Sequence, residues 1–191
     1  MASLRGGPSR GANRVRIIGG AWRSRVIRFS GSDEVRPTPD RVRETLFNWL
    51  GQDLTGACCL DLYAGSGALG FEAASRGARR VVMVERDAAA FRALEQSCTV
   101  LGARSVELVR ADALEFLRSD SGSYDVVFLD PPFRSAEWPH LLAAVTTRLN
   151  SGALVYCESA APFEIPAGWA VRRKSRAGQV CYQLLERTEH E

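Results

Sequence analysis

From residue 57 onward, short apolar runs alternate with segments whose apolar residues recur at helical spacing. The runs predict strands and the intervening segments predict helices, because side chains repeat every two residues in a strand and every 3.6 in a helix. The predicted strands are 57–62, 81–85, 106–109, 124–129 and 153–157; the predicted helices are 68–76, 87–101, 113–117 and 138–149. Such alternation predicts an α/β fold with a parallel sheet covered by helices on both faces.

The end of the chain departs from this alternation. Residues 169–173 and 180–185 read as two strands around Ala177-Gly178, with no helix between them. They predict a C-terminal antiparallel hairpin. The sheet is therefore expected to be Rossmann-like, mostly parallel and seven-stranded.

A glycine-rich turn follows the first of these strands: Asp61-Leu62-Tyr63-Ala64-Gly65-Ser66-Gly67-Ala68-Leu69-Gly70. Glycines allow a sharp turn and keep side chains out of a cofactor's path. Glu85 ends the next strand, 18 residues after Gly67, where a carboxylate can accept from both ribose hydroxyls. This order fits a dinucleotide or another ligand that contains adenosine.

Two aspartates refine this interpretation. Asp61, near the helix N-terminus, would repel a pyrophosphate but suits the ammonium of a methionine moiety. Asp112, after the third strand, either accepts from an adenine amine or caps the following short helix. The sequence leaves both roles of Asp112 open.

The segment Asp130-Pro131-Pro132-Phe133 follows the fourth strand of this series. Two prolines fix the backbone and remove two donors, leaving a stiff turn with outward acceptors. The Asp130 side chain and the Pro131 carbonyl can each accept one N–H of an exocyclic amine, and Phe133 offers a stacking face for a base. Together with the glycine turn, this segment predicts methyl transfer from S-adenosylmethionine to a ring-borne amine, with residues 130–133 as the catalytic group.

Charge is distributed unevenly along the chain. The net charge is +3, yet the residues before Asp33 hold seven arginines and no acidic residue, which leaves −4 for the remainder. A basic segment on a mildly acidic body is typical of a protein that holds nucleic acid at one end. The candidate RNA contacts are Arg14, Arg16, Trp22, Arg23, Arg25, Arg36 and Arg41.

The N-terminal third is expected to contain three parts. Residues 1–13 predict a disordered basic arm. Residues 15–18 and 25–29 predict a hairpin, and Thr38-Pro39-Asp40 predicts a helix start with Thr38 as N-cap and Pro39 as first helical residue. We therefore expect an arm at 1–13, an RNA-contacting extension at 14–53 and a cofactor-binding domain at 54–191.

Composition limits the remaining possibilities. No apolar run approaches a membrane span, and the basic N-terminus lacks the apolar stretch of a secretory signal, so a cytoplasmic location and no membrane partner are expected. Five cysteines without C-x-x-C spacing and only two histidines predict reduced thiols and no metal site.

At these residues the chain resembles the Asp/Asn-Pro-Pro-aromatic amino-methyltransferases. It is most similar to the bacterial small-subunit ribosomal RNA guanine-N2 methyltransferase family, from Arg16 to about Leu185. The more family-specific segments are Arg16-Ile17-Ile18-Gly19-Gly20-Ala21-Trp22-Arg23 and residues 36–50, Arg-Pro-Thr-Pro-Asp-Arg-Val-Arg-Glu-Thr-Leu-Phe-Asn-Trp-Leu. Tyr63 stands where the family usually has Phe, and Pro39 where Thr or a similar residue is common.

The resemblance implies a class I methyltransferase fold that uses S-adenosylmethionine. It implies transfer to the N2 of a guanine in 16S ribosomal RNA, within an assembled or partly assembled small subunit, by a protein that is expected to be a monomer. The candidate cofactor-binding residues are Asp61, Tyr63, Ala64, Gly65, Ser66, Gly67, Glu85, Arg86, Asp112, Ala113 and Asp130.

Three alternatives remain at this point. An adenine-N6 or cytosine-N4 DNA methyltransferase uses the same chemistry, but usually carries a separate recognition domain for which 191 residues leave little room. An NAD-dependent oxidoreductase does not account for the Asp130 turn. A catalytically inactive RNA-binding chaperone does not need it.

Overall fold

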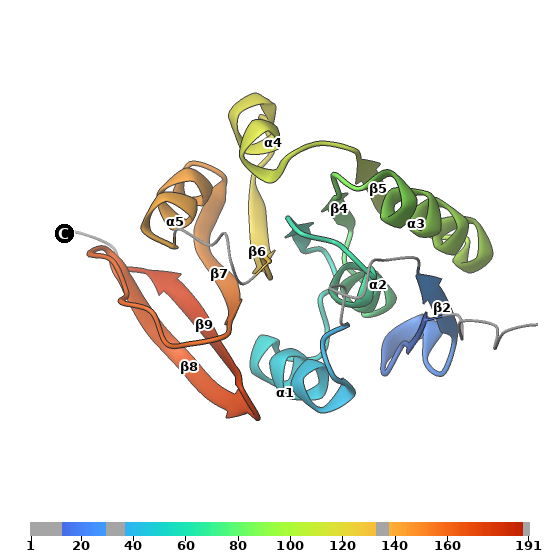
Figure 1. Ribbon diagram of the computed structural model, residues 1–191, viewed down its shortest axis with the longest axis horizontal. Coiled ribbons are helices and arrows are strands. Elements are labelled where there is room, and N and C mark those ends of the chain that lie inside the picture. Colours follow the sequence, from blue (N-terminus) through green and yellow to red (C-terminus); the bar gives the residue numbers. More distant parts are fainter. Residues whose placement is uncertain (1–12, 30–36, 133–137, 189–191) are drawn as a thin grey trace, which may run out of the picture.

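The computed structural model describes residues 13–29, 37–132 and 138–188. Its centre is a seven-stranded sheet in the order β5-β4-β3-β6-β7-β9-β8 (Figure 1). The strands are β3 (Cys58–Asp61), β4 (Arg80–Val84), β5 (Val106–Val109), β6 (Tyr124–Leu129), β7 (Leu149–Ser159), β8 (Trp169–Ala177) and β9 (Val180–Arg187). The α/β class and the seven-stranded sheet predicted from the sequence are therefore confirmed.

Strand direction confirms the rest of the predicted topology. Strands β3 to β7 pair in parallel, whereas β9 lies antiparallel between β7 and β8. From β3 the chain builds outward through β4 to β5 and then returns to place β6 on the other side of β3. Ligands of open α/β sheets bind at the carboxyl ends of strands where the order reverses, so the β3–β6 boundary is where a site is expected.

Helices cover both faces of the sheet. One core contains side chains of α1 (Asp40–Leu50), α2 (Ala68–Ser75) and α3 (Ala88–Leu101), and the other contains those of α4 (Ala113–Ser119) and α5 (Trp138–Thr146). Figure 1 shows the two groups on opposite sides of the sheet. The buried strands β3, β4 and β6 are nearly continuous apolar runs, as a sheet covered on both faces requires.

Local sequence signals set most helix ends. The Asp87 carboxylate accepts from the N–H groups of Ala89 and Ala90 and caps α3, as predicted. Gly51 and Gly102 end α1 and α3 with positive φ angles of 97° and 64°, which glycine adopts without strain. At α1 the prediction was one residue off: Pro39 occupies the N-cap position and Asp40 begins the helix, while the Thr38 hydroxyl bonds elsewhere.

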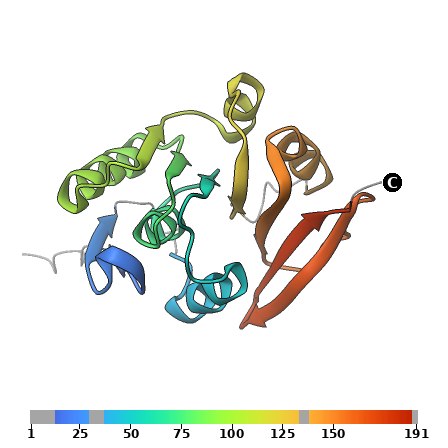
Figure 2. The same ribbon diagram turned by 180° about the vertical axis from the view of Figure 1, so that it is seen from behind.

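The N-terminal extension contains the hairpin of β1 (Asn13–Arg16) and β2 (Val26–Phe29), which pairs antiparallel, and a short 3-10 turn at Gly20–Trp22. Both views place this hairpin beside α3, at the opposite end of the molecule from β8 and β9 (Figures 1 and 2). Its buried residues Val15, Ile17, Ile27 and Phe29 join the same core as α1 and α2. This core therefore contains residues from both sides of residue 54, where the cofactor-binding domain was expected to begin. Asn13 already belongs to β1, and the rest of the expected arm, residues 1–12, lies outside the described residues.

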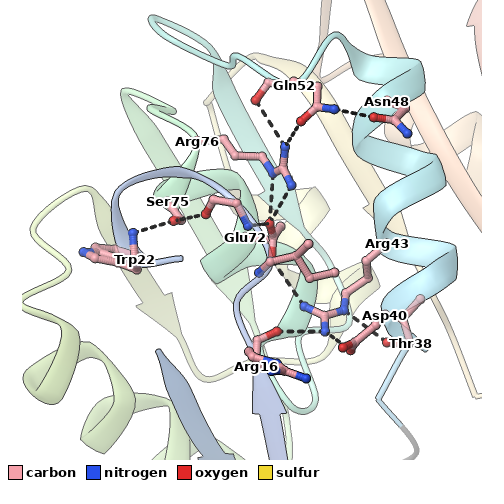
Figure 3. A network of polar contacts seen from close by, with 12 residues as sticks. Arg16, Trp22, Thr38, Asp40, Arg43, Asn48, Gln52, Glu72, Ser75 and Arg76 are labelled. Atoms are coloured by element: carbon pink, nitrogen blue, oxygen red, sulfur yellow. Dashed lines mark hydrogen bonds and ion pairs between the residues drawn. The ribbon is translucent and has the colours of Figure 1, made fainter. Parts of the chain in front are cut away.

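A buried ionic network fixes the extension to α2 (Figure 3). Glu72 accepts from the backbone N–H groups of Ile18 (2.9 Å) and Gly19 (2.8 Å). It also pairs with Arg43 of α1 (3.3 Å) and with Arg76 (2.8 Å), and all three side chains are almost fully buried. The same helix bonds the extension a second time, since the Ser75 hydroxyl accepts from the N–H of Trp22 and donates to the carbonyl of Gly19.

Replacing Glu72 with Ala should lower the free energy of unfolding by about 3–5 kcal/mol, because two buried guanidinium groups lose their shared carboxylate. Chemical denaturation measures the loss. Glu107→Ala is the matched control: it breaks an ion pair with Arg80 whose side chains are 54% and 39% exposed, so less than about 1 kcal/mol is expected. Equal losses in the two variants would contradict a central role for Glu72.

Candidate active site

The glycine turn connects β3 to α2 at the carboxyl edge of the sheet. Gly65 and Gly67 have φ angles of 49° and 79°, in the region that favours glycine. A side chain at Gly67 would also meet Phe71 and Leu94 within 2.7 Å, and one at Gly70 would meet Met83 of β4. The first two glycines therefore shape the turn, and the third lets α2 pack closely on the sheet.

The Asp61 carboxylate lies beneath this turn. It is only 2% exposed, and its Oδ2 accepts from the backbone N–H of Gly70 at 2.9 Å. Burial raises the pKa of Asp61 to about 7, and the charge of Glu85 adds to this shift. The hydrogen bond from Gly70 acts in the opposite direction. A buried acceptor therefore already occupies the start of α2, where a pyrophosphate would otherwise bind.

Glu85 comes directly after β4 and reaches the glycine turn. Its Oε2 accepts from the N–H of Gly65 at 2.9 Å, and its Oε1 accepts from the N–H of Asp87 at 2.7 Å. A carboxylate offers about four lone-pair positions, so this geometry fixes the group and leaves acceptor capacity for ribose hydroxyls. The structure thus brings Glu85 and the glycine turn together, as the sequence predicted.

Asp112 caps α4 by accepting from the N–H groups of Leu114 (2.9 Å) and Glu115 (3.3 Å) through Oδ1. Of the two roles that the sequence left open for Asp112, the helix cap is therefore present in the structure. The other carboxylate oxygen, Oδ2, can still accept a hydrogen bond. Burial and the charge of Asp112 raise the pKa of Tyr63 to about 12, while Arg86 opposes the shift. These three side chains therefore share one electrostatic environment.

The remaining small residues of the predicted cofactor site are interior. Ala64, Ser66 and Ala113 are buried, and the Ser66 hydroxyl accepts from the N–H of Ala68 at 3.3 Å. Their packing holds the backbone of the turn and the start of α4 in place.

Asp130 follows β6, the strand beside β3. It is half-buried, Pro131 is buried and Pro132 is exposed. Burial, then the charges of Glu158 and Asp61, raises the pKa of Asp130 well above its usual range. Phe133, the predicted stacking residue, lies outside the described residues.

Glu158, near the end of β7, is a site residue that the sequence did not indicate. Leu129 of β6 pairs with Cys157 of β7, so the next residue on each strand places Asp130 beside Glu158. The Oε2 of Glu158, a residue 5% exposed, accepts from the hydroxyls of Tyr156 (2.9 Å) and Thr38 (3.5 Å). Burial raises the pKa of Glu158, while both hydrogen bonds oppose the shift.

Most of the predicted RNA contacts are exposed. Arg14, Arg16, Arg23, Arg25 and Arg41 are exposed, although the Arg25 guanidinium also donates to the carbonyl of Val100 at 2.6 Å. Trp22 is half-buried against the core. Arg36 lies outside the described residues.

A groove of about 430 Å³ lies between the hairpin and the start of α1. It is lined by Arg14, Val15, Arg16, Ser24, Val26 and residues 37–40. Thr38 belongs to this lining and also bonds to Glu158. One residue of the groove lining, Thr38, is therefore hydrogen-bonded to a carboxylate near the end of β7.

Comparison with known proteins matches residues 15–186 to the family described as Conserved hypothetical protein 95. The chain belongs to this family. Ribosomal RNA small subunit methyltransferase D from Escherichia coli K12 is 41% identical over 93% of this chain and 92% of its own length. The protein of the same name from Haemophilus influenzae is 39% identical over 90% of this chain and 93% of its own.

Solved structures agree with this assignment. The structure of yhhF from Escherichia coli superposes with a TM-score of 0.84 at 40% identity, covering 93% of this chain and all of that one. TrmN from Thermus thermophilus, at 21% identity and a TM-score of 0.65 over 77% of this chain and 48% of its own, shares the fold. The family's fold is thus the class I methyltransferase fold expected from the sequence.

Two further observations concern other classes of site. Within the described ranges, no three His, Cys, Asp or Glu side chains form a group that could hold a metal ion. Among the helices of the same ranges, none is both long and apolar enough to cross a membrane.

Asp61→Asn should make the unliganded protein more stable, by an amount that grows between about pH 4 and pH 7. The folded protein holds the Asp61 proton up to about pH 7, whereas the unfolded chain loses it near pH 4, so the stability of the wild type falls across this window. Denaturation of both proteins at pH 4, 5.5 and 8 measures a difference on the order of a few kcal/mol at most. A difference that does not change with pH would show that Asp61 titrates normally.

Proposed function

We propose that this protein transfers a methyl group from S-adenosylmethionine to the exocyclic N2 of a guanine in 16S ribosomal RNA. Relatives that are 41% and 39% identical over 90% or more of this chain are named as methyltransferases, which supports this activity. The observation that carries the proposal is the position of Asp130, at the carboxyl end of β6 and directly beside the strand that leads into the glycine turn. This position supports the proposal because it puts the Asp130 carboxylate beside the turn that would hold the cofactor.

The residues at the end of β3 and β4 fit S-adenosylmethionine. The glycines keep the turn free of side chains, Glu85 supplies acceptors for the ribose, and Asp61 supplies a carboxylate for the ammonium of the methionine moiety. Asp112 retains an acceptor for the adenine amine. The bound cofactor supplies an electrophilic methyl group on a sulfonium.

The chain's own residues then align the nucleophile. Asp130 and the Pro131 carbonyl accept the two N–H groups of the guanine amine, which turns its lone pair toward the methyl carbon. Catalysis of this kind depends mainly on proximity and alignment. The raised pKa of Asp130 also suits it to take the proton that the amine releases after transfer.

The extension supplies the RNA contacts in this proposal. Exposed Arg14, Arg16 and Arg23 offer cations to phosphates, and the groove beside them leads to Thr38 at the edge of the site. A guanine must leave its stack to reach Asp130, which costs less in a loop than in a duplex. We place the reaction in the cytoplasm, on an assembled or partly assembled small subunit, with the protein acting as a monomer.

The alternatives fit the site less well. A dinucleotide's pyrophosphate would meet the buried Asp61 carboxylate at the start of α2, which disfavours an NAD-dependent oxidoreductase. A DNA methyltransferase for adenine or cytosine shares the chemistry. Relatives over 90% or more of this chain carry the name of a ribosomal RNA methyltransferase, which favours guanine in RNA.

The direct test labels small subunits from cells that lack this modification, using radioactive S-adenosylmethionine, and maps the labelled base. Label in N2-methylguanine at one position of 16S ribosomal RNA supports the proposal. Label confined to adenine or cytosine, or absent while DNA is labelled, would overturn it.

Asp130→Ala should lower the rate of methyl transfer by on the order of 100-fold or more, because one of two acceptors that align the amine is lost. Affinity for S-adenosylhomocysteine, measured by calorimetry, should stay within a few fold. Asp130→Asn is the matched variant and should lose less, since its amide oxygen still accepts one N–H. Wild-type turnover by Asp130→Ala would place the chemistry elsewhere.

Replacing Arg14, Arg16 and Arg23 together with Ala should weaken RNA binding and flatten its dependence on salt, because fewer counterions are released. Arg25 is left in place because its side chain anchors the hairpin to α3. A control triple variant removes Arg92, Arg118 and Arg172, which are exposed on α3, α4 and β8. The same salt slope in both variants, measured by filter binding, would show that the hairpin only carries a solvated charge.

A further inference from the structure

Glu158 lies next to Asp130 and has no role in the reaction proposed above. Adjacent strands are about 4.8 Å apart, and the register of β6 and β7 sets Glu158 one strand away from Asp130 at the same height. Tyr156, two residues earlier on β7, faces the core that α1 and α2 cover. Because side chains alternate along a strand, Glu158 faces the same side as Tyr156.

Hydrogen bonds within the described residues reach only one of the two carboxylate oxygens of Glu158. Its Oε2 is held by the hydroxyls of Tyr156 and Thr38, while its Oε1 has no hydrogen-bond partner in the part of the chain that the structure describes. Within the same part of the chain, no Lys, Arg or His forms an ion pair with it. Every buried side-chain nitrogen and oxygen among the described residues has a hydrogen-bond partner, so an Oε1 without one must be open to solvent, and a ligand can therefore reach it.

The two hydroxyls alone do not require a charged residue. A glutamine at this position would also accept from Tyr156 and Thr38 through its amide oxygen, without repelling Asp130. A purely structural role therefore leaves the negative charge unexplained. A ligand that presents a donor beside the amine held by Asp130 would explain it.

Guanine presents such a donor, and the other amino-bearing bases do not. Its ring N1–H lies directly beside the N2 amine, so its edge carries adjacent donors. In adenine the ring nitrogen beside the amine is an acceptor, and the same holds for cytosine. An ionised carboxylate next to the amine site would attract guanine and repel both other bases.

We propose that Glu158 determines base specificity by accepting the N1–H of the target guanine through Oε1, while Asp130 and the Pro131 carbonyl hold the N2 amine. This inference rests on the proposed function and names how the same site chooses its base. Thr38 acts as a positioning residue: it lines the groove and orients the Glu158 carboxylate through Oε2.

The experiment compares guanine with 2-aminopurine at the labelled position, in small subunits reconstituted with ligated 16S ribosomal RNA. 2-Aminopurine keeps the N2 amine but has an acceptor at N1. The wild type should methylate it at least about 100-fold more slowly than guanine, since a site built for a hydrogen bond rejects an analogue that lacks it. In Glu158→Gln the amide can donate to that N1, so the ratio should fall to within about tenfold.

Glu115→Gln, an exposed change on α4, is the matched control and should keep the wild-type ratio. The change of ratio between proteins cancels any intrinsic difference in reactivity between the two amines. Binding of S-adenosylhomocysteine by calorimetry confirms that each variant is folded.

The outcomes separate the two proposals. If the wild type leaves guanine unmethylated in these subunits, the proposed function fails. If it methylates guanine but accepts 2-aminopurine equally well, the role of Glu158 is overturned, and this comparison needs no variant. A folded Glu158→Gln protein that keeps the wild-type ratio overturns it as well.

Discussion

The carboxylate of Glu72 holds together the parts of the chain that frame the site. It is fully buried, and it joins the backbone of the hairpin at Ile18 and Gly19 to the guanidinium groups of Arg43 and Arg76. Glu72 lies on α2, the helix that begins at the glycine turn. One short helix therefore begins at the glycine turn and anchors the basic hairpin near its end.

A different electrostatic arrangement lies at the ends of β3, β6 and β7. Asp61 ends β3, Asp130 follows β6 and Glu158 lies one residue before the end of β7, and burial raises the pKa of each. Glu72 has two guanidinium partners, whereas these three carboxylates form no ion pair within the described residues. In the proposed function their partners are the ammonium of the cofactor and the N–H groups of guanine. Glu72 therefore stabilises the fold through its ion pairs, whereas the proposed function assigns the other three carboxylates to ligands.

The sequence predicted those features that depend on nearby residues. Strand and helix alternation, the Asp87 cap and the glycine helix ends all follow from local spacing. Glu158 was missed because a single acid in a strand has no pattern of its own, and only the register of β6 and β7 sets it beside Asp130. The Glu72 network was missed for a similar reason, since of its partners only Arg76 is close in sequence, while Arg43, Gly19 and Ile18 lie 29, 53 and 54 residues away.

The one-residue error at the start of α1 has a structural cause that bears on function. Thr38 has the sequence of an N-cap, yet its hydroxyl donates to Glu158 across 120 residues and leaves the cap position to Pro39. Its carbonyl accepts from Arg43, which also binds Glu72. Thr38, which lines the groove, is thus hydrogen-bonded through its carbonyl to Arg43 and through its hydroxyl to Glu158. Phosphate contacts fix the register of a nucleic acid and base contacts give specificity. Under the proposed function, the two kinds of contact would share one hydrogen-bonded path, so RNA held at the hairpin would meet a base site whose position is already set.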